Sequence, residues 1–169
     1  HPIQTLETIA QSFRRRRHPE WILSLYRRML EQGNDDPRLY KLIGDAYYAI
    51  GEAASTRQRR ELKMSIDDSR ERARHYYKLY LEEADPSSGQ LRSFASTMTS
   101  RGIWSVAARA YQGLMDRGAG GTQIYLDYGV VLLNTGRADR AHKLFEDYYE
   151  QRGKNLQDAQ RIAQHLMRE

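Results

Sequence analysis

The 169-residue sequence contains no cysteine and only four prolines. A chain without cysteine forms no disulfide, offers no thiol nucleophile and builds no cysteine-ligated zinc site. It also lacks any apolar run near the roughly 20 residues that a transmembrane helix needs, and its first residues include no apolar segment of the signal-peptide kind. We therefore expect this segment not to insert into a membrane. Its compartment, periplasm or cytoplasm, stays open.

Residue patterns that carry catalysis are absent from the sequence as well. The histidines never pair at metal-ligand spacing, and the serines have no histidine placed to activate them. The adjacent carboxylates at 67–68 and 82–83 diverge on a helix. The glycines within 118–121 lack the preceding strand and the following lysine of a phosphate loop. The sequence predicts no enzyme, no metal site and no cofactor.

The charge balance is basic, with 27 lysines and arginines against 22 acidic residues and a formal net charge of +5. Such an excess favours nucleic acid or an acidic protein as a partner. Acidic residues are nevertheless interspersed along the chain, as is typical of a solvated helix surface with internal ion pairs. The arginine-flanked tyrosines Tyr76, Tyr77 and Tyr80 either stack on bases or form a helical core, and we prefer the core.

A helix-like stretch at 37–51 has copies elsewhere in the chain. It opens on a proline suited to a first helical turn, carries apolar residues at helical spacing and stops at a glycine. Its small residue, Gly44, has small counterparts along the chain at intervals of 34 or 51 residues. Two further sets of equivalent positions, here called registers, repeat with intervals of 51, 34 and 34 residues. An interval of 51 equals the period of 34 plus an insertion of 17 residues. The three registers are Ala10, Gly44, Ala95, Gly129 and Ala163; Ile22, Ala73, Ala107 and Ala141; and Tyr26, Tyr77, Tyr111 and Phe145.

This period resembles that of the tetratricopeptide repeat (TPR) family, whose unit is a helix-turn-helix with a small residue in each helix. The second, third and fourth repeats match the family pattern, whereas the first has Arg17 in place of the turn glycine and Ile22 in place of the second small residue. The matching residues are Tyr40, Ile43, Gly44, Tyr47, Gly51, Ala73 and Tyr77; Leu91, Phe94, Ala95, Met98, Gly102, Ala107 and Tyr111; and Tyr125, Tyr128, Gly129, Leu132, Gly136, Ala141 and Phe145.

The resemblance implies an all-α fold without a sheet, a right-handed superhelical solenoid of about four and a half repeats and nine helices. We expect one domain over residues 1–169 and interpret the segment as part of a longer array. The repeats are 3–36, 37–86 with an insertion at 52–68, 87–121 and 122–154, followed by a terminal helix at 155–169.

The insertion at 52–68 is interpreted as helical, because Leu62 and Ile66 keep the helical phase of Ala73 and Tyr77. We expect the second helix of this repeat to extend backward as far as Arg57. The outer apolar residues Leu62, Met64 and Ile66 then lean on a neighbouring repeat or wait for another chain, and a second copy of this protein is one such chain. The alternative is a merely lengthened surface helix.

The resemblance also implies that the first helices of successive repeats line a concave groove. The family's groove positions can be transferred to this sequence through the repeat register. The residues at these positions are basic or polar in the first three repeats and apolar in the fourth. The fourth-repeat residues are alternatively buried under a following helix. The partner-binding residues predicted in this way are Arg14, Arg15, Arg38, Lys41, Tyr48, Arg92, Leu126, Val130 and Leu133.

Two function classes follow from these patterns. The first is a noncatalytic scaffold that binds a protein or peptide with acidic and apolar parts. Its arginine bias and tyrosine-rich repeats resemble bacterial arrays of envelope, secretion and exopolysaccharide-export assemblies. The alternative is a nucleic-acid-binding helical repeat that uses the groove arginines. We prefer the scaffold and expect no nucleic-acid binding beyond the weak nonspecific level.

Overall fold

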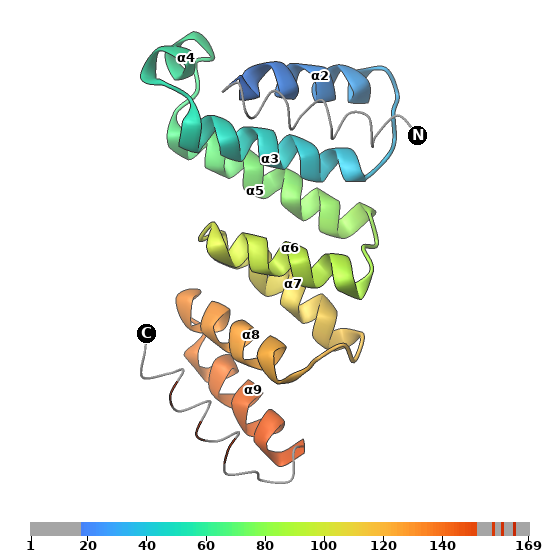
Figure 1. Ribbon diagram of the computed structural model, residues 1–169, viewed down its shortest axis with the longest axis vertical. Coiled ribbons are helices and arrows are strands. Elements are labelled where there is room, and N and C mark those ends of the chain that lie inside the picture. The colour runs from blue at the N-terminus through green and yellow to red at the C-terminus, as the bar shows by residue number, and fades with distance from the viewer. Residues whose placement is uncertain (1–17, 152–156, 158–159, 161–163, 165–169) are drawn as a thin grey trace. The chain divides into compact units, whose positions relative to one another are not determined.

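The computed structural model describes residues 18–151 together with 157, 160 and 164. These residues form helices and no strand, which confirms the all-α class (Figure 1). The helix predicted from residue 3 lies outside the described part, as does most of the terminal segment 155–169. The chain divides into two compact units, His1–Asp85 and Pro86–Glu169.

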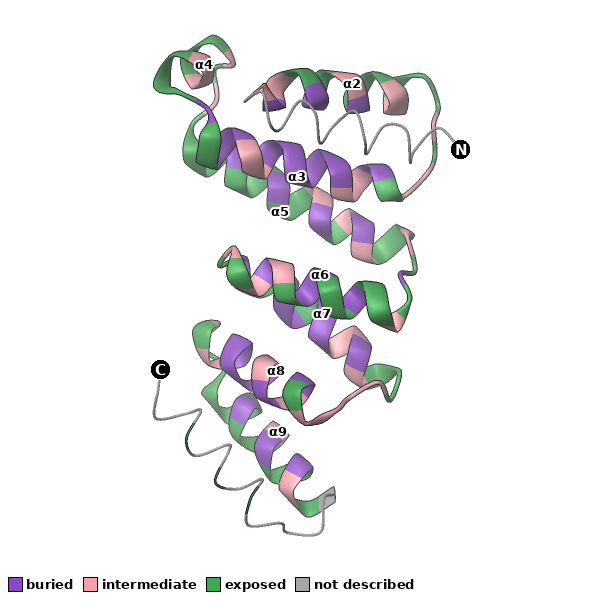
Figure 2. Ribbon diagram, in the orientation of Figure 1, coloured by how far each residue is buried: buried purple, intermediate pink, exposed green. Residues whose placement is uncertain are grey.

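The first unit is built around a central helix. Helix α3 (Arg38–Ala53) packs against α2 (Pro19–Glu31) on one side and against α5 (Ile66–Glu83) on another. Figure 2 shows buried residues along the faces where these helices meet. They are the apolar positions that recur at three- and four-residue spacing, which gives each helix a core-facing stripe. The buried set includes Ile22, Tyr26, Leu39, Ile43, Tyr47, Ile50, Ala73 and Tyr77.

The turn between α2 and α3 follows from its local residues. Gly33 has a φ of +81°, which glycine adopts without strain, and its N–H bonds to the carbonyl of Leu30. The N–H of Asn34 bonds to Met29, which completes the two-bond helix ending. Asp36 then accepts from the N–H of Arg38 at 2.9 Å, as expected for an acceptor at the start of a helix.

The insertion begins with an extension of the first helix and then departs from its prediction. Helix α3 continues past Gly51 to Ala53, in line with an interpretation of 52–55 as an extension of that helix, and Gly51 is buried against the Ser69 side chain. The continuous helix expected from Arg57 is wrong, because the segment forms a short separate helix, α4 (Thr56–Glu61), before α5 begins. Helix α4 sits at the edge of the first unit, between the ends of α3 and α5 (Figure 1).

Local capping explains the break in the insertion. Ser55 and Ser65 each form a capping box, with Gln58 and Asp68 respectively, and so each starts a new helix. Lys63, at a φ of +50°, ends α4 with the same pair of bonds that Gly33 makes after α2. The helical spacing of apolar residues continues without interruption across both helix ends. The spacing alone therefore indicated a single helix.

The second unit consists of two helical hairpins in its described part. Helix α6 (Ser88–Ser100) pairs with α7 (Trp104–Asp116), and α8 (Thr122–Asn134) pairs with α9 (Ala138–Gln151). Helix α7 also packs on α8. Gly102 and Gly136, which lie 34 residues apart, make the turns with φ of +68° and +71° and with equivalent hydrogen bonds.

The described members of the predicted registers lie in the core of the two units, whereas Ala10 and Ala163 lie outside the described residues. Ala73, Ala107 and Ala141 are at most 1% exposed, which confirms their predicted burial. The aromatic register is buried too, at Tyr26, Tyr77, Tyr111 and Phe145. Small residues at these positions let helices approach, and the rings fill the space between them.

Candidate functional site

Three of the predicted groove residues share one face of α3. Arg38, Lys41 and Tyr48 are spaced by three and seven residues, and Asp45 lies between them on the same face. Lys41 and Tyr48 are half-buried and Arg38 is exposed. This face is the only part of the predicted groove that the structure brings together within the described first unit.

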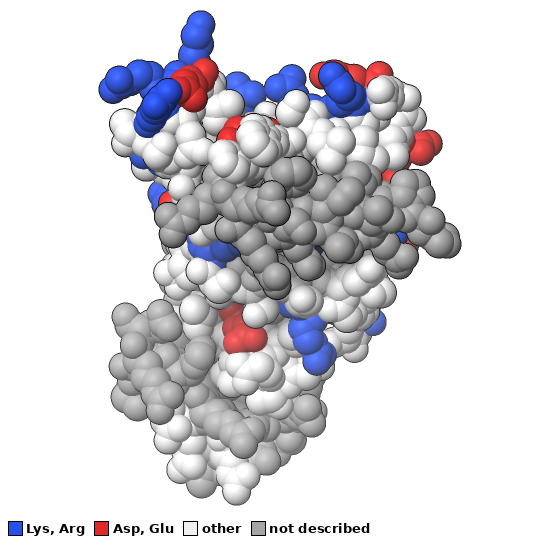
Figure 3. All heavy atoms as spheres, turned by 45° about the horizontal axis from the view of Figure 1, so that its top comes forward, with Lys and Arg blue, Asp and Glu red and all other residues white. Residues whose placement is uncertain are grey.

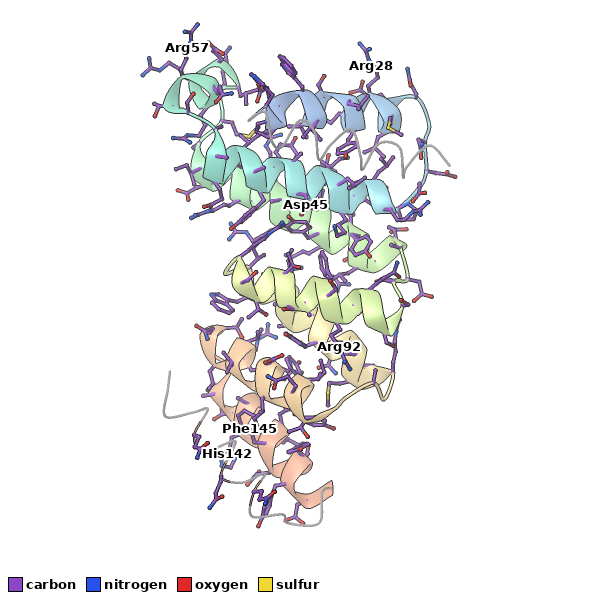
Figure 4. All side chains as sticks on the ribbon, in the orientation of Figure 1. Arg28, Asp45, Arg57, Arg92, His142 and Phe145 are labelled. Carbon is purple, nitrogen blue, oxygen red and sulfur yellow. The ribbon has the colours of Figure 1, made fainter. Side chains whose placement is uncertain are left out.

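Asp45 is the centre of this face (Figure 4). It is only 6% exposed, and each carboxylate oxygen has a donor. The Tyr77 hydroxyl donates to Oδ1 at 2.9 Å, and the Lys41 ammonium lies 3.1 Å from Oδ2. A buried carboxylate is tolerated only when it is paired in this way. The charge of Lys41 is thus committed to Asp45, and Lys41 is a weaker anchor for a partner carboxylate than its position suggested.

Arg38 is likewise paired with a local acid. Its guanidinium contacts the Asp36 carboxylate through Nε at 2.9 Å and Nη2 at 2.5 Å. Hydrogen bonding from Arg38 lowers the pKa of Asp36, against the smaller raising effect of burial. An exposed pair of this kind contributes only about 0–1 kcal/mol. Arg38 mainly secures the start of α3 in this arrangement.

The tyrosines of α5 belong to the core rather than to an open stacking surface. Tyr77 is fully buried and Tyr80 is 5% exposed. Tyr76 is half-buried and stacks on Tyr47, with ring centroids 5.6 Å apart. Burial raises the pKa of Tyr76. The preferred interpretation of these residues as core is confirmed for Tyr77 and Tyr80, whose rings have no room for a base.

The remaining predicted residues are divided between the second unit and the undescribed segment. Leu126 and Val130 are 8% and 9% exposed, in line with the alternative interpretation that they are buried. Leu133 is half-buried, and Arg92 is exposed on α6. Arg14 and Arg15 lie outside the described residues.

A hollow of about 370 Å³ lies between α2 and the end of α4. Its floor and one wall are apolar, and its rim is charged. Sequence reasoning missed it, because it exists only where α4 is folded beside α2. Its described lining residues are Glu20, Leu23, Ser24, Arg27, Arg28, Glu31 and Leu62.

The second unit has a hollow of similar size, about 300 Å³. Arg140 and Lys143 lie at its edge, and Met115 and Leu132 are among its apolar lining residues. Two of its polar lining residues bond to each other, because the Tyr128 hydroxyl donates to the Gln112 side chain at 2.8 Å.

Over the described part of the chain, no three His, Asp or Glu side chains are grouped to hold a metal ion. No helix described here combines the length and apolarity needed to cross a membrane. In comparisons with known proteins, no family model, no curated protein and no solved structure matches this chain.

Proposed function

We propose that this chain is a TPR-type helical solenoid that serves as a noncatalytic protein-interaction scaffold. The observation that carries the proposal is a helix contact that occurs once in each unit. A Cβ built on Gly44 would meet the Tyr77 ring at 2.6 Å, and one built on Gly129 would overlap the Phe145 ring.

The partners in the two contacts are separated by different lengths of chain. Tyr77 follows Gly44 by 33 residues and Phe145 follows Gly129 by 16, a difference of the 17 inserted residues. A glycine in the first helix and a ring in the second therefore close two hairpins in the same way. This equivalence supports a repeated unit in which the insertion is an addition to one copy.

A stack of such hairpins leaves helix faces, loops and the insertion as its functional surface. Charged residues of both signs occur along most of the described helices, a pattern that suits recognition of a protein partner. Burial of Tyr77 and Tyr80 removes two of the three rings that the nucleic-acid alternative would use for stacking. Membership of a bacterial secretion or envelope assembly stays a prediction from the resemblance alone.

Selection of binding peptides tests the proposal directly. The full 169-residue chain is immobilised and screened with a random 12-residue peptide phage library, and enriched peptides are measured by fluorescence anisotropy beside 20-nucleotide single and double strands. We expect saturable peptide binding at micromolar affinity and oligonucleotide binding no tighter than the nonspecific level of about 10⁻⁴–10⁻⁶ M. Sub-micromolar, salt-sensitive oligonucleotide binding with no enriched peptide would overturn the proposal.

A further inference from the structure

The hollow between α2 and α4 combines an apolar interior with a charged rim of two arginines and two glutamates, set in a surface with an excess of basic residues. We propose that it docks an acidic segment of a partner protein through one apolar anchor side chain. This inference rests on the proposed scaffold function and adds to it a site and a partner chemistry. The site lies outside the groove face of α3 that the sequence predicted.

The interior of the hollow suits a single side chain. Leu23, 6% exposed, forms the floor, and the half-buried Leu62 faces it from the end of α4. The volume of about 370 Å³ is at the low end of the roughly 300–1,000 Å³ of ligand pockets. An apolar anchor placed between the two leucines removes their remaining exposed area from water. The inserted segment thus supplies one wall of the site.

The surroundings of the hollow carry an excess of positive charge. Helix α2 and the segment 56–63 contain six basic residues against three acidic ones. Figure 3 shows basic side chains gathered at the α4 end of the first unit, and Figure 4 shows Arg28 and Arg57 pointing away from their helices. The basic residues are Arg27, Arg28, Arg57, Arg59, Arg60 and Lys63, and the acidic ones are Glu20, Glu31 and Glu61.

Part of this charge is already engaged within the unit. Arg57 pairs with Glu61 at 2.9 Å, and the Arg59 guanidinium donates to the carbonyl of Ala54. Arg27 and Arg28 are exposed at the hollow itself. They are therefore the residues best placed to meet carboxylates on either side of the anchor, where charge complementarity speeds encounter and selects the partner.

An exposed tryptophan adjoins the hollow. Trp21 is 55% exposed, and its ring stacks on His18 with centroids 4.3 Å apart and planes at 8°. It precedes the lining residues Ser24 and Arg28 by one and two helical turns, so it extends the same surface. Tryptophan and arginine are the side chains most enriched at the energetic centres of interfaces.

Glu20 favours a peptide over a nucleic acid as the occupant. Its Oε1 lies 2.8 Å from His18 Nδ1, whereas its Oε2 is buried without a hydrogen-bond partner. A peptide backbone brings N–H donors that can satisfy this oxygen once the side chain turns toward the hollow, whereas the phosphate backbone of a nucleic acid brings none. A second copy of this chain is disfavoured, because its own basic surface would face this one.

The test measures one designed peptide against matched variants of the full chain. The probe is a fluorescent 12-residue peptide of aspartate and glutamate around a central leucine, and its partner peptide has alanine in place of that leucine. The variant Arg27→Glu/Arg28→Glu reverses the rim charge. The control Arg140→Glu/Lys143→Glu makes the same charge change at the hollow of the second unit. Circular dichroism and the thermal midpoint establish that each variant is folded.

We expect micromolar binding of the probe, at least tenfold weaker binding by Arg27→Glu/Arg28→Glu, and less than twofold change in the control. The alanine peptide should also bind about tenfold more weakly, a difference of roughly 1.4 kcal/mol. Leu62→Ala should weaken the leucine peptide more than the alanine peptide. Together these results would place both the charge and the anchor at this hollow.

Other outcomes overturn the inference in recognisable ways. Absence of probe binding at millimolar protein, or equal loss in both charge variants, excludes this site. Displacement of the probe by submicromolar oligonucleotide assigns the surface to nucleic acid. Sedimentation that shows a dimer lost in Arg27→Glu/Arg28→Glu assigns it to a second copy. If library-selected peptides bind but ignore every α2 and α4 variant, the scaffold function stands and only this site fails.

Discussion

The ring of Phe145 lies over Gly129 so closely that a Cβ at position 129 would overlap it. Glycine is required here because of this approach and not because of its backbone angle, since the residue is helical and has no positive φ. In an open helix interior, glycine is about 0.5–1 kcal/mol less favourable than alanine. At position 129 glycine is instead more favourable than alanine, because an alanine Cβ would overlap the Phe145 ring.

Gly129→Ala should therefore destabilise the protein by about 1–3 kcal/mol through overpacking. Gly113→Ala is the matched control, because a Cβ there meets Leu91 at an ordinary 3.5 Å and should stabilise by about 0.5–1 kcal/mol. Urea unfolding of both variants measures the difference. In a double-mutant cycle with Phe145→Ala, the two changes should not add. Equal effects at positions 129 and 113 would contradict the contact.

The hydrogen bond from Tyr77 to Asp45 should contribute measurably to stability. Tyr77→Phe removes the hydrogen bond that the hydroxyl donates to the buried Asp45 Oδ1, at a cost of about 1–3 kcal/mol. Tyr40→Phe is the control, because the Tyr40 ring is half-buried in the same unit and its change should stay within about 0.5 kcal/mol. Chemical unfolding curves compare the two. A Tyr77→Phe protein as stable as the Tyr40→Phe protein would show that the bond has no role.

Asp36 should make the stability of the chain depend on acid pH. Its pKa is lowered in the folded state, so its contribution is present above the unfolded-state pKa and is lost as pH falls through the folded-state pKa. Asp36→Ala should cost about 0.5–2 kcal/mol near neutral pH, as for a lost helix cap. The gap between wild type and variant should shrink as the pH falls below about 4, the usual pKa of an aspartate, toward the lower folded-state pKa. Thermal melts across that range measure it, and a gap independent of pH would refute the assignment.

Deleting residues 52–68 should leave the fold intact and remove the α2–α4 hollow. The deletion places Gly51 directly before Ser69, as Gly102 stands before Ile103 in the turn between α6 and α7. Helix content and a single thermal transition should persist, while binding of the acidic peptide falls at least tenfold because Leu62 is gone. Sedimentation reports whether any self-association of the intact chain is lost with it. Unchanged peptide binding and self-association would make the insertion a passive addition.

Several features of this protein follow from local sequence. The 34-residue period placed small and aromatic residues in the core correctly, because a helix buries whatever recurs on its apolar stripe. The turns at Gly33, Gly102 and Gly136 were likewise readable, since positive φ favours glycine. The sequence by itself therefore determined the helical class, the hairpin units and the position of the insertion.

Other features depended on contacts between segments distant in sequence. The Asp45 carboxylate accepts from both Lys41 and the Tyr77 hydroxyl, and Tyr77 lies 32 residues after Asp45. No local pattern predicts that this hydroxyl reaches the carboxylate. The break of the insertion into α4 and α5 is by contrast local, because the capping boxes of Ser55 and Ser65 override a continuous apolar spacing. Only the tertiary structure decided that Leu62 faces Leu23 across a hollow and that Leu126 and Val130 are buried, because burial depends on which neighbouring elements cover a face.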